Sequence, residues 1–351
     1  MLYLLPDELL VAVAEHCSKK TRMSLSLVSR RLRDPSQRII FKVINKTLPP
    51  SCAANDRQMR ERHLEFISND RLISYIKTLN VYKNMTSYVP EVDHLELLFT
   101  ALLRMRSLRD IRLDFARVTT TMLDQLCKLL STRFLNLKLG SCTYPVNYMI
   151  QQTALKVNEL GWIDEESPPA TIGLLAAFIE KSSSTITSLT LLTDFDGLAD
   201  FGRLPQLTRF ILLRESTNGE SLREFLVANW QLVYLELRRD VQDLSLLPSS
   251  ALPNLTRIRA PAYLMHDIVP GRPVVNVRIH RLLDRWRTTL DGVRALSRST
   301  APIIELTMDL GHCSPPLNMI LDAVVEVMPH LERVQLSCHA SVRSILYYDA
   351  V

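Results

Sequence analysis

The sequence predicts an α/β fold in which a small three-helix unit is followed by a solenoid of parallel strands and helices. Two observations lead to this prediction. Short amphipathic stretches fill the first part of the chain, and one short apolar pattern returns many times after it. The predicted division is residues 1–45 for the helical unit, 46–70 for a linker and connecting helix, and 71–351 for a degenerate repeat solenoid.

Composition excludes several classes of protein. At 47% hydrophobic residues the chain can bury a sizeable core, and 9 glycines in 351 residues exclude collagen-like and glycine-rich architectures. A net charge of +5 is too dilute to indicate nucleic-acid binding by itself. The sequence shows no signal peptide, no apolar run near the ~20 residues of a membrane helix, and no CxxC pair among its six cysteines. We therefore expect a cytoplasmic or nuclear protein with reduced cysteines.

The first forty-five residues are expected to form three short helices. Pro6 suits the first position of a helix that ends near Lys19. Thr21 is a plausible N-cap for a second helix, Pro35 is expected to end it, and a third is expected over residues 36–44. So small a unit has a marginal core, so its remaining apolar side chains should need a partner to cover them.

Two motifs in this region resemble a known domain. Leu5-Pro6-Asp7-Glu8-Leu9-Leu10, followed by Leu25-Ser26-Leu27-Val28-Ser29-Arg30-Arg31-Leu32-Arg33 and Phe41, resembles an F-box over about residues 4–45. The resemblance implies docking to the Skp-type adaptor of an SCF (Skp–cullin–F-box) ubiquitin ligase, and through it to cullin. The positions that match the family's adaptor contacts are Leu5, Pro6, Leu9, Leu25, Val28 and Leu32. Arg22 stands where many F-boxes have an apolar residue.

The rest of the chain repeats one pattern: apolar, two residues, apolar, one residue, apolar. Its middle positions are Leu79, Ile111, Leu137, Leu160, Leu189, Phe210, Leu235, Ile258, Val277, Leu306 and Val334. Ten steps cover the 255 residues from the first to the last, or about 25 each, which lies within the range of leucine-rich repeats. The alternation indicates a strand with one buried face, although the unit around Val157 could instead be helical.

Helical periodicity fills the segments between these strands, at 93–103, 120–130, 172–181, 219–229 and 317–328. Strand and helix in alternation predict a solenoid, and an ordinary α/β domain with parallel strands is the alternative. The segments Leu252–Leu255 and Val269–Arg278 resemble stretches in fungal families of F-box proteins with leucine-rich repeats.

The sequence contains no motif that indicates catalysis. It has no glycine-rich phosphate loop, no zinc-ligand spacing and no GxSxG elbow, so we expect no cofactor and no metal. Trp230 and Trp286 are expected in the core. A basic cluster is expected along one helix face that is solvated, faces an acidic or phosphorylated ligand, or binds nucleic acid directly; its members are Arg278, His280, Arg281, Arg285, Arg287, Arg294 and Arg298.

The predicted function is that of a substrate receptor without catalytic residues, whose repeats hold an unknown target protein. One alternative is an F-box and repeat scaffold that acts outside ubiquitin transfer. Another is an enzyme of unrecognised type, which would need a deep pocket with converging titratable groups. The target is not predicted, because the strand positions expected to face outward share no chemistry; examples are Thr190, Ile211, Glu236 and Gln335.

Overall fold

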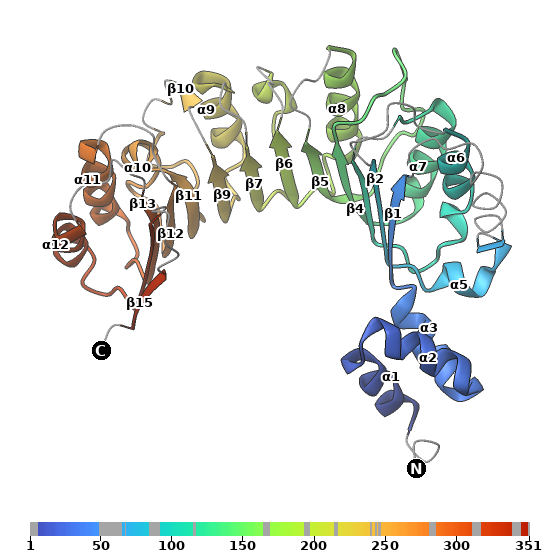
Figure 1. The fold of residues 1–351 in the computed structure, drawn as a ribbon. Coiled ribbons are helices and arrows are strands. Elements are labelled where there is room, and N and C mark those ends of the chain that lie inside the picture. The colour runs from blue at the N-terminus through green and yellow to red at the C-terminus, as the bar shows by residue number, and fades with distance from the viewer. Residues whose placement is uncertain are drawn as a thin grey trace. The chain divides into compact units, whose positions relative to one another are not determined.

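The structure is a computed structural model. It describes residues 6–48, 65, 66, 68–83, 92–114, 117–163, 169–192, 197–213, 217–238, 241, 242, 244, 247–280, 286–310, 317–338 and 345–349. The chain forms two compact units (Figure 1): residues 1–164 with 168–182, and residues 165–167 with 183–351. We call them unit 1 and unit 2 and describe each by itself.

Unit 1 begins with three helices, as predicted, but their boundaries differ. They are α1 (Asp7–His16), α2 (Lys19–Val28) and α3 (Arg30–Ile40). Pro6 is the N-cap of α1 rather than its first residue. The N-cap of α2 is Ser18, whose hydroxyl accepts a hydrogen bond from the Thr21 N–H at 3.1 Å. The prediction of Thr21 was therefore wrong by three residues.

Pro35 does not end a helix, as was predicted, but lies inside α3. The break comes earlier, at Ser29, whose extended backbone separates α2 from α3 and whose side chain accepts from the Arg31 N–H. The Ser29 N-cap starts a new helix at this point. This helix, α3, tolerates the loss of the one backbone hydrogen bond that Pro35 cannot donate. The helix predicted over residues 36–44 is consequently the second half of α3, followed by a strand.

Among the described residues, the repeat part of unit 1 contains five strands in the order β1-β2-β3-β4-β5, each parallel to its neighbours. They are β1 (Val43–Leu48), β2 (Thr78–Lys83), β3 (Asp110–Asp114), β4 (Leu135–Gly140) and β5 (Val157–Ile163). The helical elements are α5 (Asp70–Ser74), α6 (Val92–Thr100), η2 (Leu102–Arg104), α7 (Thr120–Thr132) and α8 (Pro169–Ser182). The sequence did not predict β1, whereas the doubtful unit at Val157 is a strand.

Unit 2 continues the same alternation with β6-β7-β9-β11-β12-β13-β14 in order. Its main strands are β6 (Ser188–Leu192), β7 (Arg209–Leu212), β9 (Tyr234–Leu237), β11 (Arg257–Pro261), β12 (Asn276–His280), β13 (Glu305–Leu310) and β14 (Arg333–Cys338). Between them lie η3 (Leu198–Phe201), α9 (Gly219–Ala228), α10 (Ala262–Ile268), α11 (Trp286–Ala295), η4 (Leu296–Arg298) and α12 (Leu317–Val327). The short strands β8 (Thr217–Asn218) and β10 (Val241–Gln242) pair with each other.

The last strand departs from the predicted parallel arrangement. β15 (Ile345–Asp349) pairs with β14 in the antiparallel direction, after the parallel strands of unit 2. An antiparallel partner needs only a short connection, whereas a parallel one needs a crossover of a dozen or more residues. Only six residues separate β14 from β15, too few for such a crossover.

The predicted repeat is confirmed by the register of the strands. In unit 1, Leu79, Ile111, Leu137 and Leu160 are successive pairing partners. In unit 2 the same holds for the whole series from Leu189 to Val334. Apart from Val334, which is half-buried, these side chains are buried, because they face the helices that pack on one side of each sheet (Figure 1). The fold class is therefore leucine-rich-repeat-like, after three N-terminal helices.

Aromatic side chains fill the space between strands and helices in both units. In unit 1, Trp162 is buried and its ring lies 6.4 Å from that of Phe178. In unit 2, Phe210 and Phe225 have ring centroids 4.8 Å apart. Trp230, predicted in the core, is instead 44% exposed at the end of α9, where Arg203 lies 5.4 Å above its ring. Trp286 begins α11, and its side chain lies outside the described part.

Candidate functional site

The three N-terminal helices expose apolar side chains at helical spacing. On α1, Leu9 and Val13 are 49% and 38% exposed; on α2, Met23 and Leu27 are 53% and 81% exposed. Each pair is separated by four residues, so its members lie on the same face of their helix. Large apolar side chains left exposed on a small domain mark sites of protein association. We call these four side chains the apolar helix surface.

The predicted adaptor contacts occupy different environments. Pro6 and Leu9 are exposed, and Leu25 is half-buried. Leu32 is buried with 7% exposure, so it supports the helices from within. Leu5 and the side chain of Val28 lie outside the described residues. Sequence reasoning did not select Met23 and Leu27, although their four-residue spacing on a polar helix was a usable signal.

Polar side chains hold these helices together without covering the apolar helix surface. The Arg22 guanidinium donates to the carbonyl oxygen of Cys17 at 2.8 Å and to that of Glu15 at 3.3 Å, at the end of α1. Carbonyls at a helix C-terminus lack intrahelical donors, and a cation satisfies them well. Arg22, which stands where related domains have an apolar residue, thus fixes the connection between α1 and α2.

A carboxylate on α3 joins the three helices to the start of the repeats. Asp34 accepts hydrogen bonds from Arg71 and Tyr75 and forms an ion pair with Arg38 at 2.9 Å. Burial opposes ionisation of Asp34, but the hydrogen bonds from Tyr75 and Arg71 outweigh burial and lower its pKa. Nearby, Phe41 packs on Phe66 with centroids 5.7 Å apart. These contacts run from the middle of α3, at Asp34, to its C-cap, Phe41.

The sheet of each unit has a second face, turned away from the helices. Side chains that alternate with the buried rows project from it. Of the outward positions named above, Thr190, Ile211 and Glu236 are indeed successive partners across β6, β7 and β9. Ile211 and Glu236 are nonetheless buried by their neighbours on this face, at 9% and 3% exposure.

The predicted basic helix face is divided between two kinds of element. Arg278 and His280 belong to β12 and face the sheet surface, since they alternate with the core residues Val277 and Ile279. Arg287 and Arg294 belong to α11, and Arg298 to η4; Arg281 and Arg285 lie outside the described part. The strand continues to His280, which pairs with Pro261, so no single helix face carries the cluster.

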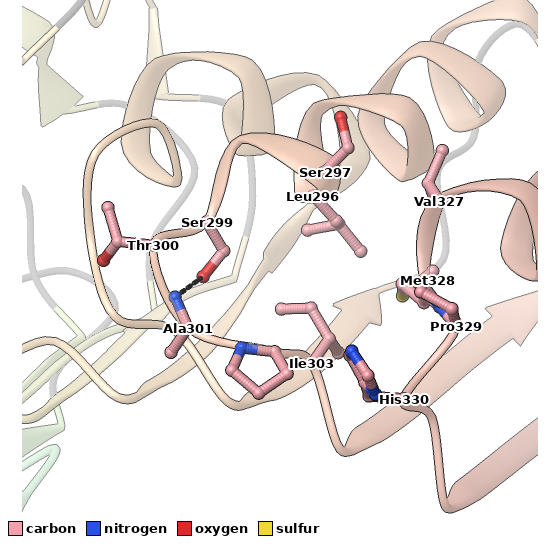
Figure 2. A pocket seen from close by; sticks show the side chains of 11 residues that line it. Leu296, Ser297, Ser299, Thr300, Ala301, Ile303, Val327, Met328, Pro329 and His330 are labelled. Atoms are coloured by element: carbon pink, nitrogen blue, oxygen red, sulfur yellow. Dashed lines mark hydrogen bonds between the residues drawn. The ribbon is translucent and has the colours of Figure 1, made fainter.

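Two hollows of the described part have different linings. A hollow of about 390 Å³ in unit 1 is lined by the cationic residues Lys77, Arg106, Arg109 and Arg133, with no carboxylate or histidine among its lining residues. A second, of about 310 Å³, lies between η4 and the end of α12, with Leu296, Ile303, Met328 and His330 among its lining residues (Figure 2). Its Ser299 hydroxyl accepts from the Ala301 N–H at 3.3 Å and lies 3.0 Å and 2.9 Å from two carbonyl oxygens. His330 is the one titratable side chain in its lining. Within the described ranges, no three His, Cys, Asp or Glu side chains are grouped to hold a metal ion.

Comparison with protein families identifies the N-terminal unit. Residues 2–34 match the F-box domain, and this range contains α1, α2 and the first half of α3. Comparison with curated proteins gave no match. The chain therefore carries an F-box domain followed by leucine-rich-repeat-like strands and helices. F-box proteins are typically non-catalytic subunits of ubiquitin ligases. Of the helices described, none has the length and apolarity to cross a bilayer.

Proposed function

We propose that this protein is the substrate-recognition subunit of an SCF-type ubiquitin ligase. The F-box binds a Skp-type adaptor, the adaptor links it to cullin, and the repeats hold a target protein. In this proposal residues 1–45 form the adaptor-binding unit, 46–70 connect it to the repeats, and 71–351 form the target-binding array. We expect the protein in the cytoplasm or nucleus.

The observation that supports this proposal most is the apolar helix surface within the matched F-box. Leu9 and Leu27 are 49% and 81% exposed, although burial against a partner could contribute up to about 1.5–3 kcal/mol at Leu27 and about half of that at Leu9. The surrounding polar contacts, such as those of Arg22, stabilise the helices and leave these side chains uncovered. The adaptor contacts are Pro6, Leu9 and Leu25 together with Leu5 and Val28, and Leu32 supports them from within.

The chain contributes to ubiquitin transfer by position rather than by chemistry. Holding a target near a ubiquitin-charged enzyme turns a bimolecular transfer into an effectively local one, which raises its rate without any nucleophile from the receptor.

The test is co-purification of the full chain with a Skp-type adaptor. We expect Leu9→Asp with Leu27→Asp to abolish binding, since both changes place a carboxylate in the apolar contact. The matched control is Val325→Asp on α12, which is 75% exposed on another part of the chain and should leave binding unchanged. Retained adaptor binding in the double variant would contradict the docking proposal. Capture of adaptor without cullin would favour the scaffold alternative.

A further inference from the structure

The sheet face of unit 2 carries an excess of positive charge. Over strands β6 to β14 and the residue after β9, its described side chains include six arginines and three carboxylates, a difference of three positive charges. These are Arg209, Arg238, Arg257, Arg259, Arg278 and Arg333 against Glu236, Glu305 and Asp309. We call this surface the arginine face.

The carboxylates of the arginine face are already paired: Glu305 with Arg333, and the other two with several partners each. Glu236 accepts from the Tyr234 hydroxyl at 2.7 Å and from Arg238 at 2.9 Å, and it forms an ion pair with Arg259 at 3.3 Å. Asp309 accepts from Ser337 and lies 3.7 Å from Arg278 and 3.9 Å from His280. These contacts use most of the acceptor positions of both carboxylates, so they orient the arginines without neutralising all of them.

The arginines also stand beside one another. Arg259 on β11 and Arg278 on β12 are register partners on neighbouring strands, about 4.8 Å apart along the sheet. Like charges directly opposite each other destabilise a sheet. Both side chains retain exposure, 22% for Arg259 and 45% for Arg278, so an anion can reach them.

We propose that the arginine face binds an extended protein segment rich in aspartate or glutamate. The class of target is therefore a protein with such an acidic segment. This inference rests on the proposed function. The cations of Arg209, Arg259 and Arg278 are spread over β7, β11 and β12 rather than converging on one point. That arrangement suits several single charges along an extended chain better than one phosphate.

The dimensions of the face set the length of the segment. From β7 to β12 there are three inter-strand steps, or roughly 14 Å, which matches about four residues of extended chain at 3.3 Å each. Guanidinium groups form paired hydrogen bonds with carboxylates, and Glu236 and Asp309 hold several of them in place before binding.

The experiment measures binding of fluorescein-labelled peptides to the full chain by fluorescence anisotropy. The probes are a short peptide with alternating acidic residues, its Gln/Asn counterpart, a neutral peptide with one phosphoserine, and a single-stranded oligonucleotide. We expect the acidic peptide to bind about tenfold more tightly than the others and its affinity to fall with added salt. Tighter binding of the phosphopeptide or of the oligonucleotide would overturn the proposal.

Charge-reversal variants locate the site. Arg259→Glu with Arg278→Glu should weaken the acidic peptide about tenfold. The matched control is Arg294→Glu with Arg298→Glu, which changes net charge equally on exposed residues of α11 and η4. Equal weakening by both pairs would mean unspecific attraction and would overturn the proposal. Arg259→Gln with Arg278→Gln removes the two charges without adding new ones, and thermal unfolding checks that the sheet is still folded. Weaker peptide binding by a folded variant is then a loss of binding and not of structure.

Failure of this inference and failure of the proposed function are distinguishable. Peptide binding does not require the adaptor, and adaptor binding does not require the arginine face. If the chain captured the adaptor but showed no preference for the acidic peptide, the proposed class of target would be wrong. The proposed receptor function would be unaffected.

Discussion

The sheet faces of the two units arise from the same repeat and carry different chemistry. In unit 1 the side chains form amide contacts: Asn80 donates to Asn45 at 2.9 Å, and Asn136 donates to Asp110 at 2.8 Å and accepts from Asn158 at 3.3 Å. In unit 2 the corresponding rows hold several guanidinium groups around the buried Glu236 and the half-buried Asp309, where the face of unit 1 has the pair Arg112–Asp114. The repeat therefore constrains only the inward rows, and the outward rows are free to differ in function.

Unit 2 also uses a guanidinium away from its face, and removing it should have the largest effect. Arg272 has no exposed surface and donates to carbonyl oxygens of Ala251 at 2.9 Å, Pro248 at 2.8 Å and Pro270 at 2.7 Å. Burial lowers the pKa of Arg272, and its guanidinium is held by backbone carbonyl oxygens. We expect Arg272→Met to lower the free energy of unfolding by about 3–5 kcal/mol, because several buried carbonyls lose their donor.

Denaturant unfolding measures this effect. Arg294→Met on α11, where the side chain is 61% exposed, is the control and should change stability by less than about 0.5 kcal/mol. Equal stability of the two variants would show that unit 2 does not depend on the buried guanidinium.

The second change concerns a close approach between neighbouring strands in unit 1. A Cβ at Gly140 would overlap the carboxylate of Asp114, which accepts from Arg112 at 2.7 Å on the neighbouring strand. Gly140→Ala should therefore cost about 1–3 kcal/mol of stability by displacing that ion pair. Gly173→Ala on α8, where no atom lies within 4 Å of the added carbon, is the matched control and should be neutral or stabilising. A tolerated Gly140→Ala would mean that Asp114 moves at little cost.

The smallest expected effect is a difference between the two faces in how stability depends on pH. Burial opposes ionisation of Glu236, but its bonds to Tyr234 and Arg238 outweigh burial and lower its pKa below the ordinary value of 4.5. The unfolded chain then binds more protons in acid, so this stabilisation is present above pH ~4.5 and is lost as the pH falls through the folded pKa. Glu236→Gln should cost about 1 kcal/mol at neutral pH and flatten the acid side of the stability profile.

The comparison with unit 1 is made with Asn80→Ala, since Asn80 donates to the neutral amide of Asn45. That variant removes a neutral group, so it should lower stability by a similar or smaller amount at every pH without changing the slope. The Asp309 pKa is lowered as well, chiefly by His280, so some slope should remain in Glu236→Gln. If the slope of stability against pH were unchanged in Glu236→Gln, Glu236 would not contribute to the acid sensitivity of unit 2.

The core rows were predictable because their signal is local and repeated. Each middle position from Leu79 to Val334 stands in a strand, and each is paired with its counterpart in the neighbouring repeat of its own unit. The boundaries of the F-box helices were less predictable, since Ser18 and Thr21 are equally good caps and only one of them begins the helix. The strand β1 was missed because Ile39, Ile40 and Phe41 continue a helical pattern up to its edge, and pairing with β2 decides where that pattern ends.

The sequence by itself determined that apolar residues at fixed spacing build repeated strands and that a short helical unit with F-box motifs precedes them. Burial of apolar area dictates this pattern wherever it occurs, so it can be read without coordinates. Only the tertiary structure decided that Leu9 and Leu27 remain exposed while Leu32 is covered, and that arginines from separate repeats gather on one face. Those relations depend on which strands and helices become neighbours. The local sequence of one segment does not show which distant segment it will contact.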